Sequence, residues 1–117
     1  MLIYRIENSK GIGPYHSKII YSIESRDMFC WERCPGPIED TIYEANEEFY
    51  YGFKSMWQLR RWFNKQVRKE IVKHSYTTDF YYSIYKVDPS HVKIGKKQVA
   101  FIKNKAKLIN RQLLSEI

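Results

Sequence analysis

Hydrophobic and β-branched residues open the chain and predict a first strand. Residues 2–6 read Leu-Ile-Tyr-Arg-Ile, a run rich in the side chains that favour strands. The following segment, residues 8–14, contains two glycines and a proline and is typical of a turn or loop. Residues 18–23 fit a second strand, and an irregular loop over residues 15–23 would fit the same side chains.

The segment from residue 27 to residue 48 is acidic and broken by prolines. Pro35 and Pro37 fix their own φ angles and push the residues before them toward extended conformations, so no helix runs through this point. We therefore expect a long irregular connection here, followed by a short helix near residues 38–47.

A helix is predicted from Ser55 onward. Ser55 and Gln58 have the spacing of a capping box, in which the hydroxyl accepts from the backbone of Gln58 and the Gln58 side chain reaches back to that of Ser55. The apolar residues that follow are spaced by three or four and share one face, which we expect to pack on the core. They are Leu59, Trp62, Phe63, Val67 and Ile71. The rest of the helix surface, up to Lys73, is cationic, with Glu70 as its one acid.

The second half of the chain predicts three strands. Residues 80–87 are aromatic and β-branched, as is typical of a strand. Residues 92–94 and 98–102 predict two shorter strands, and Gly95-Lys96-Lys97 between them predicts a hairpin turn.

The last segment predicts a basic amphipathic helix. Residues 104–114 place Ala106, Ile109 and Leu113 at spacings of three and four, with Lys and Arg around them. The predicted elements together give an α+β fold, a small mixed or antiparallel sheet packed against a central amphipathic helix, with this basic helix at the C-terminus.

Length and composition indicate a single domain over residues 1–117. The chain is 44% hydrophobic and has ten Tyr, six Phe and three Trp, which is enough bulk for one core without covalent staples. Its two cysteines, Cys30 and Cys34, are too few for a disulfide-stapled secreted scaffold, and no export signal follows Met1. No apolar run approaches the roughly 20 residues that cross a bilayer. We expect a cytoplasmic protein without a membrane partner.

Charge is divided unevenly along the chain. Residues 1–53 carry five Lys or Arg against nine Asp or Glu, a balance of −4, and residues 54–117 carry fifteen against four, a balance of +11. A cationic half steers anionic partners toward itself, which indicates nucleic acid or a protein that handles it. The opposing interpretation, that the lysines only solvate outer faces, has equal weight.

The cations expected to contact a partner come from the predicted helix and the basic C-terminal region. They are Arg60, Arg61, Lys65, Arg68, Lys69, Lys96, Lys97, Lys103, Lys107 and Arg111. If they gather on one exposed surface, that surface would bind a polyanion. The acidic segment from Glu32 to Glu48 would offer a second contact that imitates nucleic acid.

Metal and nucleotide motifs are weak in this sequence. Cys30 and Cys34 are separated by three intervening residues rather than the two of a zinc knuckle, and no second pair follows, so we expect no metal site. Gly11 and Gly13 lack the third glycine and the helix of a dinucleotide fingerprint. The histidines have no partner at ligand spacing and are interpreted as surface or structural residues; they are His16, His74 and His91.

Aromatic residues next to cations suggest one further hypothesis, that nucleic-acid bases stack on exposed rings. The candidates are Tyr50, Tyr51, Tyr81, Tyr82 and Tyr85. Tyrosine is also a common half-buried core residue with its hydroxyl at the rim, and this structural interpretation is favoured for any single ring.

Several short motifs resemble those of a family of small phage and prophage proteins, over nearly the whole chain. They are Tyr4-Arg5, Gly13-Pro14-Tyr15, Tyr51-Gly52-Phe53-Lys54-Ser55, Gln58-Leu59, Trp62-Phe63, Tyr85-Lys86-Val87, Val92, Gly95, Gln98-Val99 and Phe101. The resemblance implies a mobile-element origin and an action against host defences, for instance inhibition of a CRISPR complex. It implies a host protein or ribonucleoprotein as partner, in the cytoplasm of the host bacterial cell, and no cofactor. A phage protein without a host target would carry the same motifs.

The order of elements is also remotely similar to that of a minimal ADP-ribosyltransferase. That similarity implies NAD as cofactor, with Arg5 holding its phosphates, Ser55 bracing the nicotinamide pocket and Gln98 in the position of the catalytic acid. Gln98 departs from the pattern, since a transferase normally needs a carboxylate there. A host protein modified with ADP-ribose is therefore the alternative to the binding protein.

Overall fold

The described chain forms two small antiparallel sheets and two short helices. The computed structural model describes residues 1–14, 34–73 and 79–116. One sheet has the strand order β1-β3-β6 and the other β2-β5-β4. Their strands are β1 Leu2–Asn8, β2 Phe49–Gly52, β3 Phe80–Val87, β4 Val92–Ile94, β5 Val99–Ile102 and β6 Ala106–Leu113. The helices are α1 Met56–Trp62 and α2 Lys65–Lys73, with short 3₁₀ turns at Pro89–His91, Lys103–Lys105 and Leu114–Glu116. The predicted α+β class is confirmed.

Sheet β1-β3-β6 has a hydrophobic cluster on each face, because Tyr82 and Tyr85, which belong to different clusters, point to opposite sides of β3. The helices pack on one face, where Leu59, Trp62 and Val67 meet Ile6 and Tyr82. The second sheet packs on the opposite face, in a cluster formed by Ile3, Tyr85, Val87, Val99 and Phe101. Strand β3 is therefore buried on both faces. Its aromatic side chains point alternately to the two faces, and both faces are covered.

A close backbone contact joins the two sheets. Tyr4 and Phe53 exchange two backbone hydrogen bonds of 2.8 Å each, directly after β2. A Cβ atom on Gly52 would lie 2.7 Å from the Ile3 side chain and 2.8 Å from the Tyr4 carbonyl oxygen. Only glycine allows this approach of the two strands.

The predicted C-terminal helix over residues 104–114 is wrong, since this segment forms strand β6 at an edge of the first sheet. Its pairing with β3 shifts register between Tyr85, which faces Leu108, and Ile84, which faces Asn110. Ile109 is the extra residue of this bulge. An added residue breaks the alternation of a strand, and the resulting spacings of three and four imitate a helix.

The single helix expected from Ser55 to Lys73 is divided into α1 and α2. Phe63 leaves the helical region with a ψ of 83°, and Asn64 starts the second helix by accepting a hydrogen bond of 3.0 Å from the Val67 amide. The turn lets Phe63 pack edge-on against Phe53, with ring centroids 6.1 Å apart. The predicted apolar face is buried as expected, although two helices share it.

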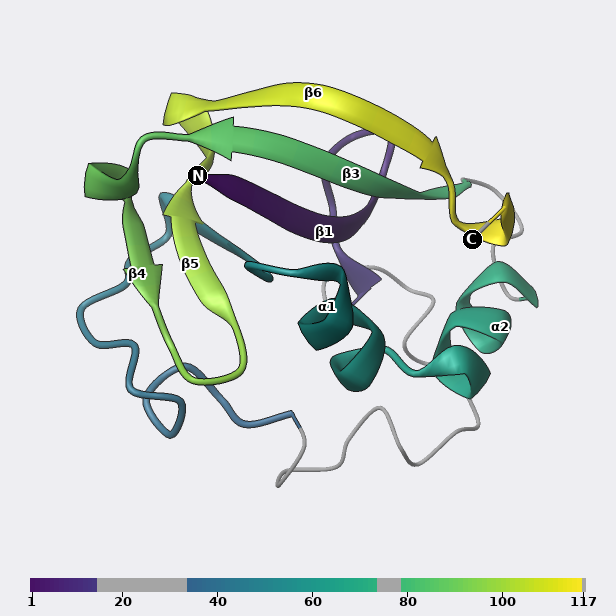
Figure 1. The fold of residues 1–117 in the computed structure, drawn as a ribbon, viewed down its shortest axis with the longest axis horizontal. Helices are drawn as coiled ribbons and strands as arrows, with labels where there is room; N and C mark the ends of the chain where they lie inside the picture. The colour runs from purple at the N-terminus through teal and green to yellow at the C-terminus, as the bar shows by residue number, and fades with distance from the viewer. Residues whose placement is uncertain (15–33, 74–78, 117) are drawn as a thin grey trace.

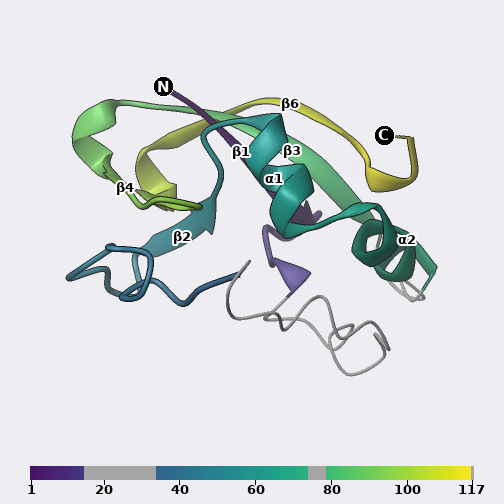
Figure 2. The ribbon, with the colours of Figure 1, turned by 60° about the horizontal axis from the view of Figure 1, so that its bottom comes forward.

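Residues 34–48 form a series of turns, and the short helix predicted near residues 38–47 is wrong. Thr41 and Glu44 have φ angles of 67° and 60°, which an α-helix excludes. Phe49–Gly52, which no pattern marked as a strand, forms β2 through pairing with β5. The loop of residues 34–48 projects away from α2 in both views of the ribbon (Figures 1 and 2). The strand predicted at residues 18–23 lies outside the described residues.

Candidate functional site

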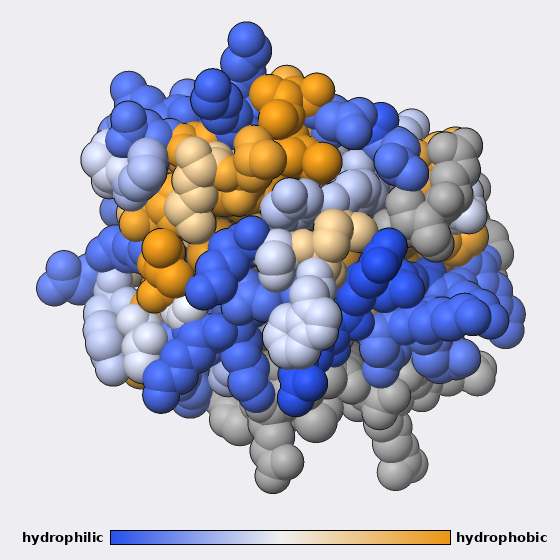
Figure 3. Space-filling model, viewed as in Figure 1, coloured by the Kyte–Doolittle hydropathy of each residue, from blue (hydrophilic) through white to orange (hydrophobic). Residues whose placement is uncertain are grey.

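Exposed cations lie on the outer surface of the two helices. Arg60 and Arg61 occupy the last turn of α1, and Lys65 and Lys69 lie on α2, all four exposed. No carboxylate in the described part of the chain forms an ion pair with any of them. We call these four residues the helical basic face. Figure 3 shows hydrophilic side chains over α1 and α2, whereas hydrophobic ones gather over the strands.

Arg68, which we predicted to contact a partner, has a role inside the protein. Its Nη1 donates a 2.7 Å hydrogen bond to the carbonyl oxygen of Phe63, where α1 ends. Partial burial and the nearby positive charge of Arg60 lower the pKa of Arg68 below its ordinary value. Arg60 and Arg68 are therefore close enough to repel each other, which indicates a concentrated positive charge at the junction of the helices.

Trp57 is the functional candidate that sequence reasoning missed. Its side chain is 67% exposed, although Trp62 on the same helix is buried. The guanidinium carbon of Arg61, one helical turn further on, lies 5.4 Å from the centre of the Trp57 ring. The sequence held one signal for this residue, since Trp57 falls outside the apolar face that begins at Leu59.

The turn between β4 and β5 brings Lys96 and Lys97 beside α1. The Gln58 side chain donates a 3.2 Å hydrogen bond from Nε2 to the carbonyl oxygen of Lys96. Its Oε1, which would accept from the Ser55 amide in a capping box, has no hydrogen-bond partner among the described residues, so the second half of the predicted box is wrong. The first half is confirmed, because Ser55 Oγ accepts a 3.1 Å hydrogen bond from the Gln58 amide. Gln58 thus links two segments that contribute predicted cations.

Asp40 holds the turn between β4 and β5 through hydrogen bonds to its backbone. Its buried carboxylate accepts hydrogen bonds of 2.9 and 3.0 Å from the Lys97 amide and of 2.9 Å from the Gln98 amide. A Cβ atom on Gly95 would lie 2.4 Å from the same carboxylate, so glycine is required at this position. The Lys96–Lys97 backbone is therefore held in one conformation beside α1.

The other predicted cations lie elsewhere in the fold. The Lys103 amine lies 4.8 Å from the centre of the Tyr85 ring and 5.7 Å from that of the Tyr50 ring. Lys107 is exposed and pairs with Lys86 across the strands. Arg111 forms an ion pair with Glu7 and is part of an internal network. The ten predicted residues thus form several groups rather than one patch.

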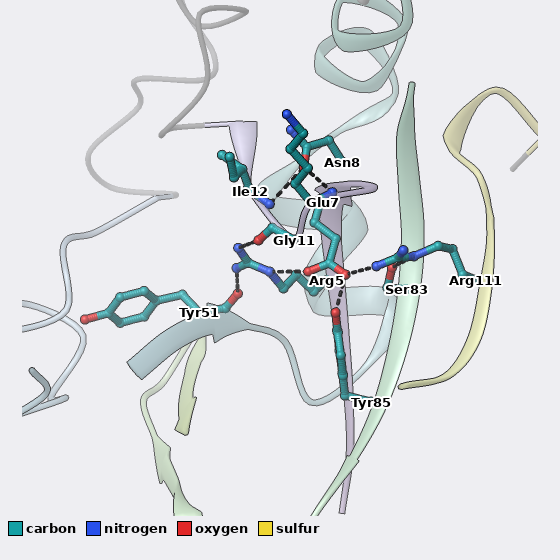
Figure 4. A network of polar contacts seen from close by, with 10 residues as sticks. Arg5, Glu7, Asn8, Gly11, Ile12, Tyr51, Ser83, Tyr85 and Arg111 are labelled. Carbon is teal, nitrogen blue, oxygen red and sulfur yellow. Dashed lines mark hydrogen bonds and ion pairs between the residues drawn. The ribbon is translucent and has the colours of Figure 1, made fainter. Parts of the chain in front are cut away.

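A buried network surrounds Glu7 (Figure 4). The Glu7 side chain is fully buried, and its carboxylate accepts from Arg5 Nε at 2.8 Å and from Arg111 Nη2 at 2.5 Å. The Tyr85 hydroxyl donates to the same carboxylate. Arg111 also donates from Nε to Ser83 Oγ at 3.0 Å. The network ties β1, β3 and β6 together on the face opposite the helices.

Opposing influences act on the pKa of Glu7. Burial alone raises it, but the hydrogen bond from Tyr85, the charge of Arg5 and the hydrogen bond from Arg111 together bring it below the ordinary 4.5. The pKa of Tyr85 is raised, first by burial and then by its hydrogen bond to Glu7. Glu7 is therefore ionised and Tyr85 protonated near neutral pH.

The three residues assigned to the ADP-ribosyltransferase hypothesis each have internal hydrogen bonds. Arg5 is buried and, besides its ion pair with Glu7, donates to the carbonyl oxygens of Tyr51 at 2.5 Å and Gly11 at 3.1 Å. Ser55 caps α1. Gln98 is buried, and its Nε2 donates to the carbonyl oxygen of Pro35 at 3.1 Å. Catalysis and NAD binding stay predictions.

The tyrosines considered for base stacking differ in accessibility. Tyr82 and Tyr85 are buried in the two clusters. Tyr51 and Tyr81 are half-buried, and the Arg111 guanidinium carbon lies 5.4 Å from the centre of the Tyr81 ring. Tyr50 is 37% exposed, with Arg5 and Lys103 next to its ring. Trp57, whose side chain is 67% exposed, offers more accessible ring surface than any of these tyrosines.

In residues 1–14, 34–73 and 79–116, no group of three or more His, Cys, Asp or Glu residues could hold a metal ion. Cys30, His16 and His74 lie outside these ranges. Over the same part of the chain, no helix has the length and apolar character needed to cross a membrane.

Comparison with known proteins identifies a family and leaves its activity open. The family model described as Bacteriophage T4 Y00F protein matches residues 1–115. Comparisons with curated proteins and with solved structures gave no match. The family match confirms the phage origin that the sequence motifs implied. Because the match extends over almost the whole chain, this protein belongs to the Bacteriophage T4 Y00F protein family.

Proposed function

We propose that this phage protein is an inhibitor that binds host nucleic-acid-handling defence machinery, of the CRISPR type, through the helical basic face and the adjoining Lys96–Lys97 turn. The observation that carries the proposal is the group Arg60, Arg61, Lys65 and Lys69, exposed and without described acidic partners. The partner is a host protein or ribonucleoprotein in the cytoplasm of the bacterial cell, and the binding needs no cofactor.

Electrostatics supports a polyanionic partner. A surface on which cations outnumber acids attracts anions at long range and accelerates their association. The sequence of α1 contains no acidic residue, and neither helix has one in its first turn. An anionic surface that spans both helices would therefore meet mostly positive charge, with Glu70 of α2 as the one acid in the two helices.

Lysine and arginine differ in what they add to such a contact. Arg60 and Arg61 offer planar groups that bind phosphate or carboxylate in a bidentate manner, whereas Lys65 and Lys69 act as point charges. The fixed Lys96–Lys97 turn extends the surface along α1. Such a surface would compete for a site that nucleic acid occupies on the defence complex or would bind its nucleic-acid component.

Charge reversal tests the proposal in bacteria. The protein is expressed in isogenic hosts with and without CRISPR immunity, and the plating efficiency of a targeted phage is measured. Wild-type protein should raise plating in the immune host alone, and the R60E/R61E/K65E variant should not. We leave Arg68 unchanged because its bond to Phe63 would confound binding with folding.

A matched variant controls for net charge. Lys10, Lys86 and Lys105 are exposed away from the helical basic face, so K10E/K86E/K105E makes an equal change in charge. This control variant should protect the phage as well as the wild type does. Both variants should melt close to the wild-type temperature, because each exposed substitution changes stability by less than about 0.5 kcal/mol. Equal protection by wild type and R60E/R61E/K65E would disprove the assignment of this face.

A further inference from the structure

Trp57 is unusual in its exposure. A tryptophan leaves a large apolar area in water when it is not buried, and 67% of Trp57 is exposed. Packing gives no reason for a large ring at this position, because Leu59, Trp62 and Phe63 already fill the inner side of α1. An exposed aromatic side chain of this size is typical of a binding surface.

The surroundings of the ring are cationic. Arg61 lies against it, with the guanidinium carbon 5.4 Å from the ring centre, and this contact reduces the freedom of both side chains. Lys54 and Arg60, close by in sequence, are exposed. A ligand here would meet a flat apolar surface next to positive charges within one turn of a helix.

This combination suits one class of polyanion better than others. Single-stranded nucleic acid presents flat bases and phosphates on every residue, so a base can stack on an aromatic ring while cations hold the backbone. A duplex keeps its bases inside the stack, and an acidic protein surface supplies charge without a regular supply of flat rings.

We infer that Trp57 is a stacking platform for an unpaired base, with Arg61, Arg60 and Lys54 holding the flanking phosphates. The inference rests on the proposed function and names its ligand as the single-stranded nucleic acid of the host machinery. It assigns affinity to stacking as well as to charge, and these two contributions respond differently to mutation and to salt.

Fluorescence polarisation with labelled single-stranded DNA and RNA of about a dozen nucleotides tests this, since such a length spans typical site sizes. W57A should weaken binding by roughly 10-fold, the loss expected for one stacked base, and W57F should lose less. The salt dependence of W57A should match the wild type, whereas R60E/R61E/K65E should show a shallower dependence because fewer phosphates are neutralised.

Tyr43 provides the matched control, since it is 59% exposed on the loop that projects away from α2. Y43A should bind like the wild type, and a duplex of the same sequence should bind more weakly and not respond to W57A. Single-strand binding by W57A at wild-type strength would overturn the inference. Protection of phage without any single-strand binding would overturn it as well and leave the proposed function standing, whereas the absence of both activities would remove both.

Discussion

Two buried carboxylates, those of Glu7 and Asp40, connect distant segments by different means. Glu7 forms ion pairs with Arg5 and Arg111 and accepts a hydrogen bond from the Tyr85 hydroxyl. Asp40 accepts from the backbone amides of Lys97 and Gln98 and needs no cation. Burying a carboxylate is costly unless charges or several donors compensate it. Both Glu7 and Asp40 have that compensation.

Replacing Glu7 by Gln should destabilise the protein strongly. The change leaves the charges of Arg5 and Arg111 buried or half-buried without their anion, and breaking a buried pair in this way costs about 3 kcal/mol or more. Urea unfolding followed by circular dichroism measures the loss. The exposed Glu39 provides the control, and E39Q should change the free energy of unfolding by less than about 0.5 kcal/mol.

The same variant should alter the pH dependence of stability. The folded pKa of Glu7 lies below its ordinary 4.5, so its ionisation contributes stability that is fully present above 4.5 and lost as pH falls through the lower folded value. Between about pH 6 and about pH 3 the wild type should therefore lose more stability than E7Q. An equal loss in both proteins would contradict this assignment.

Residue-scale features differ in how far the sequence revealed them. The Ser55 cap was predictable because its partner, the Gln58 amide, lies three residues away. The partners of Glu7 were not, since Tyr85 and Arg111 lie 78 and 104 residues away in sequence. Trp57 was visible as an apolar residue off the helix face, but its exposure depends on what the folded chain leaves uncovered.

At the scale of the elements, the break between α1 and α2 shapes the helical basic face. The apolar spacing continues across the break, so periodicity alone favours one helix. Asn64 ends this continuity because its side chain caps α2, and Arg68 closes the junction from the other side by binding Phe63. The two helices therefore present Arg60 and Lys65 from separate short segments.

Substitution of Asn64 by Ala should weaken the junction. Loss of an N-cap side chain typically costs about 1 kcal/mol, and the Val67 amide would lose its 3.0 Å acceptor. N64D keeps an acceptor at the same place and should retain most of the stability. Thermal and urea unfolding of both variants decides the point, and equal stability of N64A and N64D would show that the cap is not needed.

Strand β6 shows how a bulge hides a strand from pattern analysis. Ala106, Leu108 and Arg111 face Val87, Tyr85 and Ser83, so their spacing changes from two to three where Ile109 is inserted. A strand at an edge also needs fewer apolar residues, and exposed lysine is common there because it discourages further pairing. The edge of β3 offered hydrogen bonds that outweighed a weak helical pattern.

At the scale of the whole molecule, one sheet carries two cores. The helices cover one face of β1-β3-β6 and the second sheet covers the other, so β3 contributes Phe80 and Tyr82 to one cluster and Tyr85 and Val87 to the other. Shared strands couple the clusters mechanically. The single domain expected from the length of the chain stays a prediction that unfolding experiments can test.

A substitution in one cluster should be felt in the other. Val99→Ala, in the cluster of the second sheet, should lower stability by roughly 2 kcal/mol. In a W31F/W57F background, the fluorescence of Trp62 reports on the helix cluster. Its urea midpoint should fall together with that of circular dichroism. The partly exposed Val72 gives the control V72A, and separate midpoints in V99A would indicate two independent units.

The sequence by itself determined the α+β class, the first strand, the hairpin around Gly95, the cap at Ser55 and the excess of positive charge after residue 53. Each depends on neighbouring residues or on composition, which are local properties. Tertiary structure alone decided that Phe49–Gly52 and Ala106–Leu113 become strands. It also decided that Glu7 forms ion pairs with two arginines and that the cations separate into groups. Those outcomes depend on which segments meet in space, where hydrogen bonds and burial between distant residues outweigh local preference.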